Sequence, residues 1–404
     1  MASLVKPKDD KKMTMNQILK LVDTAADKIN QKAGKVICGR IGKTPEIMDR
    51  LKIRFIPTPS MVMNNAIGGG FPRRRCSIIS GMPDSGKTSV LLETIAINQK
   101  KDPNFFAVWL ESESSLEQSY LIDTMHIDPD RFFYMEVRHG QSAEEILDVL
   151  YTILQTGIAD MVVINSLKCL VPKHEEEASL ASATVAEQAR MNSRIVKKFR
   201  AIVAEYDTAF VIVQHLSSDI MSYGAPLVLS GGKAIQYWSA LTLSLSRSKK
   251  KFEAKDPLKD GEGAKIYVSV LKNHVLCDRN PYVRFEYYVV YGQGTEQILE
   301  ALTVAESKGI AAVRGAWVYW YDKNGEEKQK WNGRAAFRKY MLEHKDVWQE
   351  FMGQLNGQEE ASDMSEEEIA KTIEDDQKLG EAVINLEEMA MSEEEVEEAE
   401  KKDS

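Results

Sequence analysis

The sequence predicts an α/β fold with a mostly parallel central sheet that helices cover on both faces. From about residue 56 to residue 296, taken as the core domain, apolar segments of strand length alternate with segments of helical periodicity. This alternation is typical of parallel sheets buried on both sides. A chain of 404 residues, 43% hydrophobic and 28% charged, is long enough for two or three globular domains. The expected strands are 76–80, 105–110, 161–165, 210–214, 240–245 and 266–271, and the expected helices include 88–101 and 189–205.

Residues 1–55 are expected to form an arm outside the core. Within residues 14–33, five apolar side chains fall on one helical face, and Gly34 would end that helix. Residues 35–41 are typical of a short strand. One helix and one strand cannot bury their own apolar face, so we expect the arm to dock elsewhere. The residues of this face are Ile18, Leu21, Val22, Ala25 and Ile29.

A small α+β domain is expected at residues 297–358. The aromatic segment 317–321 is followed by Asn324-Gly325, which is a strong signal for a two-residue hairpin turn. A basic helix should come next. Its basic residues are Arg334, Arg338 and Lys339.

The final segment, residues 359–404, carries most of the negative charge. It has 19 acidic and 4 basic residues, a net charge of −15, so the rest of the chain is +6 although the whole chain is −9. The segment repeats a Met-Ser-Glu-Glu-Glu block and lacks aromatic residues, which is typical of a disordered tail. A mildly basic body suggests a polyanionic partner, with which the acidic tail would compete. A purely solubilising tail is the alternative.

The composition favours a cytoplasmic protein. No apolar run approaches the ~20 residues that span a bilayer, and the N-terminus leads into no secretory segment. The cysteines lie far apart without metal-ligand spacing, which is typical of reduced, structural thiols. They are Cys38, Cys76, Cys169 and Cys277.

The segment 81–88, GMPDSGKT, matches the phosphate-binding pattern GxxxxGK[ST]. It follows an apolar segment and opens a helical one, and this context makes the pattern specific. Backbone N–H groups of the loop and of the helix N-terminus would bind the phosphates of ATP. Lys87 would contact the β- and γ-phosphates, and the Thr88 hydroxyl would hold Mg²⁺. The predicted nucleotide-binding residues are Gly81, Asp84, Ser85, Gly86, Lys87, Thr88 and Ser89.

Hydrolysis of ATP needs a carboxylate that polarises water and usually an acid near the metal. Glu111 and Glu113 follow the strand 105–110 and, by alternation, point to the same side. The strand 161–165 should deliver a metal-binding aspartate but ends in Asn165. Either Glu111 helps to supply the missing charge, or Mg²⁺ is held less tightly. We therefore expect Glu111 and Asn165 near the metal, together with Thr88.

Four segments, in the right order, resemble the RecA recombinases over about residues 29–350. INQKAGKVICGRIG is similar to the helix and strand by which RecA subunits clasp a neighbour, and IPTPSMVMNNAIGGGFPRRRCSIISGMPDSGKT to the entry into the phosphate loop. LSGGKAIQYWSA resembles the end of the second DNA-binding loop, and RGAWVYWYDKNGEEKQ the C-terminal hairpin. The pair Gln214-His215 and the acidic tail are more similar to phage recombinases of the UvsX type than to cellular members.

This resemblance implies a role for several residues of the site. Glu113 falls on the glutamate that activates water in the family. Tyr120 falls on the aromatic residue that stacks on adenine, with Glu117 near the base. His215 takes the position that senses the γ-phosphate, although a histidine at a strand end can equally be structural.

The resemblance also implies contacts with the next subunit and with DNA. Lys272 matches one of two lysines that reach the neighbour's ATP, and His274 stands in place of the second. DNA would meet the loops 172–189 and 217–233, which are long and rich in small polar residues. The expected DNA-binding residues are Arg190, Ser193 and Lys197 at helical spacing, Gly231 and Gly232 in the second loop, and Arg247 beside the basic run 249–251. A solvated basic surface is the alternative for these side chains.

The implied function is that of an ATP-dependent DNA recombinase. Such a protein forms a head-to-tail filament on single-stranded DNA, pairs it with double-stranded DNA and exchanges strands in recombination and repair. Hydrolysis of ATP would reset the filament, and a single-strand-binding or mediator protein is a further expected partner. Two alternatives remain open. One is a hexameric helicase of the same core fold, and the other, which Asn165 keeps open, is an ATP-gated scaffold that does not hydrolyse.

Overall fold

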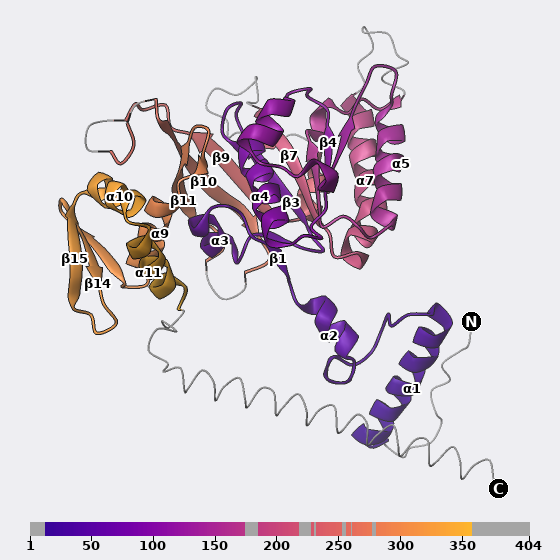
Figure 1. The fold of residues 1–404 in the computed structure, drawn as a ribbon. Helices are drawn as coiled ribbons and strands as arrows, with labels where there is room; N and C mark the ends of the chain where they lie inside the picture. The colour runs from indigo at the N-terminus through magenta and orange to yellow at the C-terminus, as the bar shows by residue number, and fades with distance from the viewer. Residues whose placement is uncertain are drawn as a thin grey trace, which may run out of the picture. The chain divides into compact units, whose positions relative to one another are not determined.

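The computed structural model describes residues 13–173, 185–217, 228–229, 232–252, 256–259, 261–276 and 280–357. The chain divides into two compact units (Figure 1), Met1–Ala254 with Leu258–Glu300 and Lys255–Pro257 with Ala301–Ser404. Within the described residues, no helix combines the length and the apolarity needed to cross a membrane. The predicted tail at residues 359–404 lies outside the described residues.

A mostly parallel sheet forms the core of the first unit, as predicted. Its strands are β3 (Cys76–Gly81), β4 (Ala107–Glu111), β5 (Phe132–Glu136), β6 (Met161–Asn165), β7 (Ala209–Ser217), β8 (Val228–Leu229), β9 (Ser239–Arg247), β10 (Gly263–Asn273), β11 (Arg284–Val290) and β12 (Gly294–Thr295). The strand order is β12-β11-β10-β9-β3-β7-β6-β4-β5, and β8 pairs with β7. The stretch from β9 to β5 is parallel. The predicted strand 266–271 lies in β10, which extends the sheet with antiparallel pairing.

Helices cover both faces of this sheet (Figure 1). They are α3 (Met61–Ile67) and α4 (Lys87–Lys101) on one face, and α5 (Ala143–Gln155) and α7 (Val185–Glu205) on the other. Successive strand residues point to opposite faces, so Ile79 and Val163 join the first hydrophobic layer while Ile78 and Val162 join the second. The two predicted helices are α4 and α7, and α7 begins a few residues earlier than predicted.

Several short elements complete the first unit. They are η1 (Ile41–Lys43), α2 (Pro45–Leu51), β1 (Phe55–Ile56) paired with β2 (Phe71–Pro72), η2 (Tyr120–Thr124), η3 (Pro129–Arg131), η4 (Leu167–Cys169), α8 (Gly232–Trp238) and the first residues of α9 (Gln297–Ser307).

The arm contains the predicted helix but not the predicted strand. Helix α1 (Met15–Ala33) begins with a capping box between Thr14 and Gln17 and ends at Gly34 in the left-handed conformation. None of its residues is buried, and its apolar face is exposed. The segment 36–40 is extended but pairs with no strand; instead, the Asn30 side chain bonds its backbone. A strand needs a partner, and the described part of this chain supplies none here.

The second unit contains the predicted hairpin and basic helix, but the hairpin loop is longer than the predicted two residues, because β14 ends at Tyr321, β15 begins at Glu327, and the Asp322 N–H donates to the Glu326 carbonyl. Its sheet is antiparallel with the order β13-β14-β15. Trp320, Trp331, Phe337 and Phe351 pack at its centre. Its elements are β13 (Ala311–Arg314), β14 (Trp317–Tyr321), β15 (Glu327–Asn332), α10 (Arg334–Glu343) and α11 (Lys345–Asn356), with the last residues of α9.

Candidate active site

The loop between β3 and α4 has the geometry that phosphate binding requires. β3 ends at Gly81 and α4 begins at Lys87, so the segment 81–88 joins a buried strand to a helix N-terminus. Asp84 and Gly86 have positive φ angles of 59° and 85°, which turn the loop back on itself. Among the described residues, no side chain caps the helix, which leaves its first N–H groups available to an anion.

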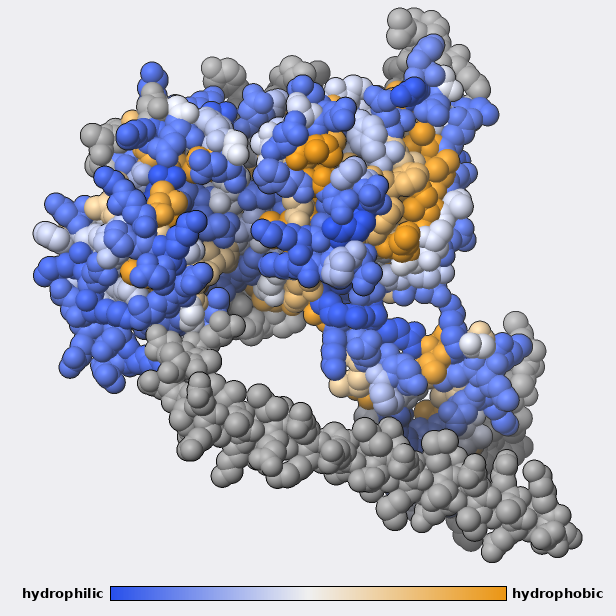
Figure 2. All heavy atoms as spheres, in the orientation of Figure 1, coloured by the Kyte–Doolittle hydropathy of each residue, from blue (hydrophilic) through white to orange (hydrophobic). Residues whose placement is uncertain are grey.

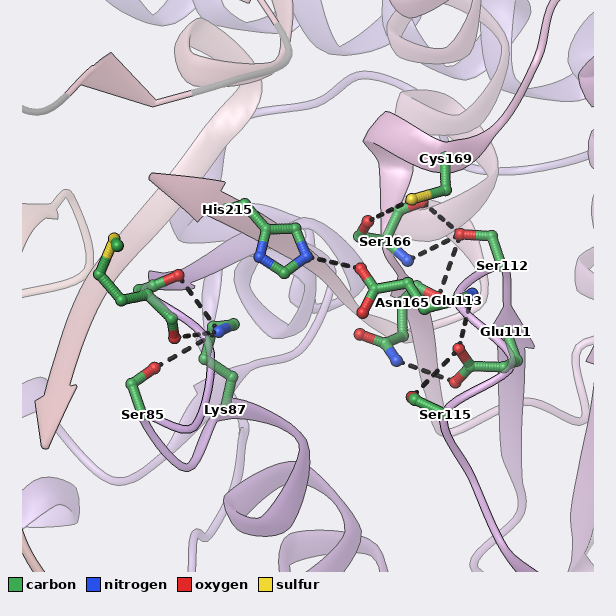
Figure 3. Close-up of polar contacts among 12 residues, drawn as sticks. Ser85, Lys87, Glu111, Ser112, Glu113, Ser115, Asn165, Ser166, Cys169 and His215 are labelled. Carbon is green, nitrogen blue, oxygen red and sulfur yellow. Dashed lines mark hydrogen bonds and ion pairs between the residues drawn. The ribbon is translucent and has the colours of Figure 1, made fainter. Parts of the chain in front are cut away.

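The side chain of Lys87 lies folded across this loop. Its Nζ donates hydrogen bonds to the carbonyl oxygens of Gly81 (3.2 Å) and Met82 (2.8 Å) and to Oγ of Ser85 (3.4 Å) (Figure 3). Burial lowers the pKa of Lys87, and the nearby charge of Glu113 opposes this change. The loop carbonyls thus hold the ammonium group in place beside the loop.

Glu113 and His215 meet beside the phosphate loop. His215 lies on β7 directly opposite Gly81 of β3. Its Nε2 shares a hydrogen bond of 2.6 Å with Oε1 of Glu113, which follows β4 (Figure 3). Burial raises the pKa of Glu113, but hydrogen bonds from Ser166 and His215 and the charge of Lys87 outweigh it, so the net shift is downward. Glu113 is therefore a carboxylate at neutral pH.

Glu111 and Asn165 form a buried pair behind Glu113. They face each other on β4 and β6, and Asn165 Nδ2 donates to Oε2 of Glu111 over 2.8 Å. The carboxyl group of Glu111 also accepts hydrogen bonds from Trp109 Nε1, from the backbone N–H of Glu113 and from Ser115 Oγ. Glu111 is fully buried, and these donors use its oxygens, which argues against the predicted direct contact with Mg²⁺.

With Glu111 engaged in these hydrogen bonds, Thr88 and Asn165 are the predicted metal-binding residues that remain. Among the described residues, no group of three acidic, histidine or cysteine side chains could hold an ion. Thr88 lies in the first turn of α4, and Figure 3 shows the amide oxygen of Asn165 on the side of the group away from Glu111. This donor set fits an Mg²⁺ ion that takes most of its ligands from phosphates and water.

A cavity of about 260 Å³ adjoins the phosphate loop on the side of β10 and β11. Tyr120 lines it, and its hydroxyl lies 2.9 Å from Oγ of Ser89. Glu117, predicted near the base, is exposed and does not line the cavity. Arg247, predicted to bind DNA, does line it. The lining residues that the sequence did not point to include Glu93, Tyr287, Tyr291, Gly292, Gly294 and Thr295.

Comparison with known proteins decides the family. The model of the RecA N-terminal domain matches residues 20–296. The chain belongs to the RecA family. Protein RecA of Lactobacillus acidophilus is 29% identical over 351 residues, which cover 86% of this chain and 88% of that protein. Protein RecA of Aquifex pyrophilus is 29% identical over 340 residues, with coverages of 83% and 91%, and that of Syntrophus aciditrophicus is 29% identical over 330 residues, with 81% and 90%.

In this RecA-family subunit, Lys272 is engaged away from the phosphate loop. Its Nζ donates to the carbonyl oxygens of Gln236 (2.8 Å) and Tyr237 (3.5 Å) at the end of α8. Burial lowers the pKa of Lys272. His274 is exposed. Neither residue lines the cavity of its own subunit, which leaves the predicted contact with a neighbour's ATP as a proposal.

The structure describes only some of the residues that were predicted to bind DNA. Arg190, Ser193 and Lys197 lie on α7 and are exposed or half-buried, and Arg190 lines a hollow with Arg194 and Glu144. Ser193 Oγ donates to the backbone of its own helix, 2.9 Å away. Gly232 begins α8. Gly231 and most of the loops 172–189 and 217–233 lie outside the described residues.

Proposed function

We propose that this chain is an ATP-dependent DNA recombinase and a DNA-dependent ATPase. It binds ATP at the segment 81–88, assembles head to tail on single-stranded DNA and catalyses pairing and strand exchange. The observation that carries this proposal is the contact between Glu113 and His215 beside the phosphate loop. It joins a candidate base to a strand that continues to Ser217, where the predicted second DNA loop begins.

The hydrolytic step uses side chains that the fold already brings together. Lys87 exchanges its loop carbonyls for the β- and γ-phosphates when ATP enters, since phosphate oxygens are stronger acceptors for an ammonium group. Glu113, ionised at neutral pH, orients the attacking water and accepts its proton. Mg²⁺, when bound, neutralises charge on the phosphates, and Thr88 and Asn165 are the residues that would hold it and its water.

His215 links the nucleotide to DNA in this proposal. In the structure, it holds Glu113 by a hydrogen bond of 2.6 Å. A γ-phosphate next to Gly81 offers His215 a second, more strongly charged partner, and a change of partner frees the carboxylate for water. The same change moves the end of β7 and therefore the loop that follows it. DNA affinity then depends on the presence of the γ-phosphate.

Assembly of subunits is proposed to use the arm. The apolar residues of α1 are uncovered, with Leu21 59% exposed, and the segment 36–40 pairs with no strand in the part of the chain that the structure describes. The edge strand β5 offers an open edge with Phe133 exposed, next to the hydrophobic surface that Figure 2 shows on the side of α5. We propose that the arm of one subunit covers this edge on the next. Lys272 would then leave the end of α8 and reach the neighbour's ATP.

DNA is proposed to bind at the start of α7 and at the loop before α8. Arg190, Ser193 and Lys197 share one side of α7 and can reach a phosphate backbone together. Gly231 and Gly232 would let the backbone approach phosphates closely. Double-stranded DNA, a single-strand-binding or mediator protein, a cytoplasmic location and an origin in a phage are further parts of this proposal.

The test of the function is a single substitution in the phosphate loop. Lys87→Ala removes the side chain with which the ATP-binding subunit itself places a full positive charge at the γ-phosphate in this proposal, so DNA-stimulated phosphate release and strand exchange should be lost. The far-ultraviolet circular dichroism spectrum should not change. Phosphate release at the wild-type rate by Lys87→Ala would refute the site. Electron microscopy of wild type with ATP and single-stranded DNA separates open filaments from the closed rings of a helicase.

A further inference from the structure

Arg247 and Tyr291 form a pair in the lining of the cavity beside the phosphate loop. Arg247 is the last residue of β9, and Tyr291 directly follows β11. The guanidinium carbon of Arg247 lies 5.6 Å from the centre of the Tyr291 ring, and its Nη2 donates a hydrogen bond to the Tyr291 hydroxyl. Both residues line the cavity together with Asp84 and Gly86 of the phosphate loop.

The cavity is suited to the nucleoside part of ATP. Tyr120 lines it as a second aromatic residue, and Ile266 and Val289 supply apolar lining. Its other lining residues include the start of α4, where the phosphates would be held. A flat, aromatic group joined to phosphates therefore matches the lining in both shape and chemistry.

The turn that carries Tyr291 is braced at its other end by Glu93 of α4. One carboxylate oxygen accepts from the backbone N–H of Thr295 (2.9 Å) and the other from its hydroxyl (2.8 Å). A Cβ at Gly294 would lie 2.6 Å from this carboxylate, so glycine allows the close approach. Arg247 holds one end of the turn and Glu93 the other.

From this arrangement we infer that Arg247 is a nucleotide-positioning residue and not a DNA contact. It holds the Tyr291 ring against the base of the bound nucleotide and adds a cation to that wall of the site. This inference rests on the proposed function only in taking the cavity as the place of the ATP nucleoside. It replaces the DNA-binding role that the basic run around residues 247–251 suggested.

The experiment measures ATP binding and DNA binding separately. ATP and ADP are titrated calorimetrically, without DNA, into wild type, Arg247→Gln, Arg247→Lys and the control Arg284→Gln. Arg284 is an exposed arginine at the far end of β11 from Tyr291. Arg247→Gln should raise the Kd for ATP by up to roughly 30-fold, the limit set by the whole energy of the Arg247–Tyr291 cation–π contact, and Arg247→Lys should raise it less. Arg284→Gln should leave the Kd at the wild-type value.

Two further readouts separate positioning from general damage. In steady-state hydrolysis with DNA, Arg247→Gln should raise KM for ATP and leave kcat unchanged within about twofold, because Glu113 and Lys87 are untouched. At saturating ATP, its affinity for single-stranded DNA and the salt dependence of that affinity should equal those of Arg284→Gln.

The opposite pattern would overturn the inference. An unchanged Kd for ATP in Arg247→Gln, with weaker DNA binding and a shallower salt slope, would make Arg247 a phosphate-backbone contact. Failure of the proposed function looks different. In that case wild type itself would not bind ATP, or Lys87→Ala would bind and hydrolyse it normally.

Discussion

Glu111 shows how a buried carboxyl group determines the residue opposite it. Its two oxygens accept four hydrogen bonds, and one of the donors is the Asn165 amide on the neighbouring strand. An aspartate at position 165 has no N–H to donate and would bring a second acid to the same buried position. The sequence places Asn165 where a metal-binding aspartate was expected. In the structure, the Asn165 amide is the hydrogen-bond donor that Glu111 requires.

We expect Asn165→Asp to destabilise the protein by on the order of 3 kcal/mol, because two buried carboxyl groups about 2.8 Å apart cannot both ionise. The loss should grow as the pH rises above the ordinary titration range of carboxyl groups. Urea denaturation at pH 5 and pH 8 measures it. The double variant Glu111→Gln/Asn165→Asp restores one donor and one acceptor, so it should recover most of the stability. A single variant as stable as wild type at pH 8 would contradict this account.

A substitution of Glu113 tests its proposed role as the acceptor of the proton of the attacking water. Glu113→Gln keeps the size of the side chain but cannot accept a proton, so hydrolysis should fall by roughly 10²–10⁴-fold while ATP still binds. Because contacts that include His215 lower the pKa of Glu113 in the free protein, kcat/KM of wild type should fall through its protonation only below the usual carboxyl range. Phosphate release at saturating ATP and Mg²⁺ measures the effect of Glu113→Gln, and kcat/KM as a function of pH measures the protonation of Glu113. A larger kinetic loss in Glu111→Gln, with its fold intact, would reverse the roles of the two acids.

At the scale of elements, Glu300 ties α9 to the start of α3. The Val62 backbone N–H donates to Oε2 of Glu300 over 3.3 Å, while Oε1 has no hydrogen-bond partner among the described residues. Burial raises the pKa of Glu300 to about 8, although hydrogen bonds from Ser60 and from the backbone of Met61 and Val62 lower it. The folded state thus favours the protonated acid.

This shift predicts a pH dependence of stability. Between pH 4.5, the value for an unperturbed glutamate, and pH 8, the unfolded chain ionises Glu300 and the folded one does not. The contribution of Glu300 to the free energy of unfolding is therefore complete below pH 4.5. It is lost as the pH rises toward 8, by up to about 1.4 kcal/mol per pH unit. Glu300→Gln removes the titrating group and with it this pH dependence. Its urea midpoint relative to wild type should rise from pH 5 to pH 8.5, and a constant difference would contradict the assignment.

The elements that the sequence predicted correctly are those with a local cause. Buried strands such as 161–165 are continuous apolar runs, and Asn324-Gly325 encodes its own turn. Residues 35–41 have the composition of a strand, but a strand also needs a partner, which a local pattern does not supply. The nucleotide role inferred for Arg247 would be a further example of this limit. Its basic neighbours suggested DNA, while the pairing of β9, β10 and β11 brings it to Tyr291.

At the scale of the whole molecule, charge is divided between body and tail. Residues 359–404 have a net charge of −15 and the rest of the chain +6. An attached polyanion competes with DNA at a high effective concentration. We expect deletion of residues 359–404 to tighten binding of single-stranded DNA most at low salt, and the gain should shrink as salt screens the tail beyond about 8–10 Å. Titration of labelled DNA with both proteins at several salt concentrations measures this, and superimposable curves would leave the tail without a role in DNA access.

In any filament built by the arm, the uncovered apolar face of α1 makes the two ends unlike. Each subunit offers one arm and receives one, so a row of subunits leaves an unused arm at one end and an unused acceptor surface at the other. The two ends should therefore gain and lose subunits at different rates. A free peptide with the sequence of residues 14–43 would occupy the acceptor surface at one filament end and on every free subunit, so it should slow the addition of subunits at both ends.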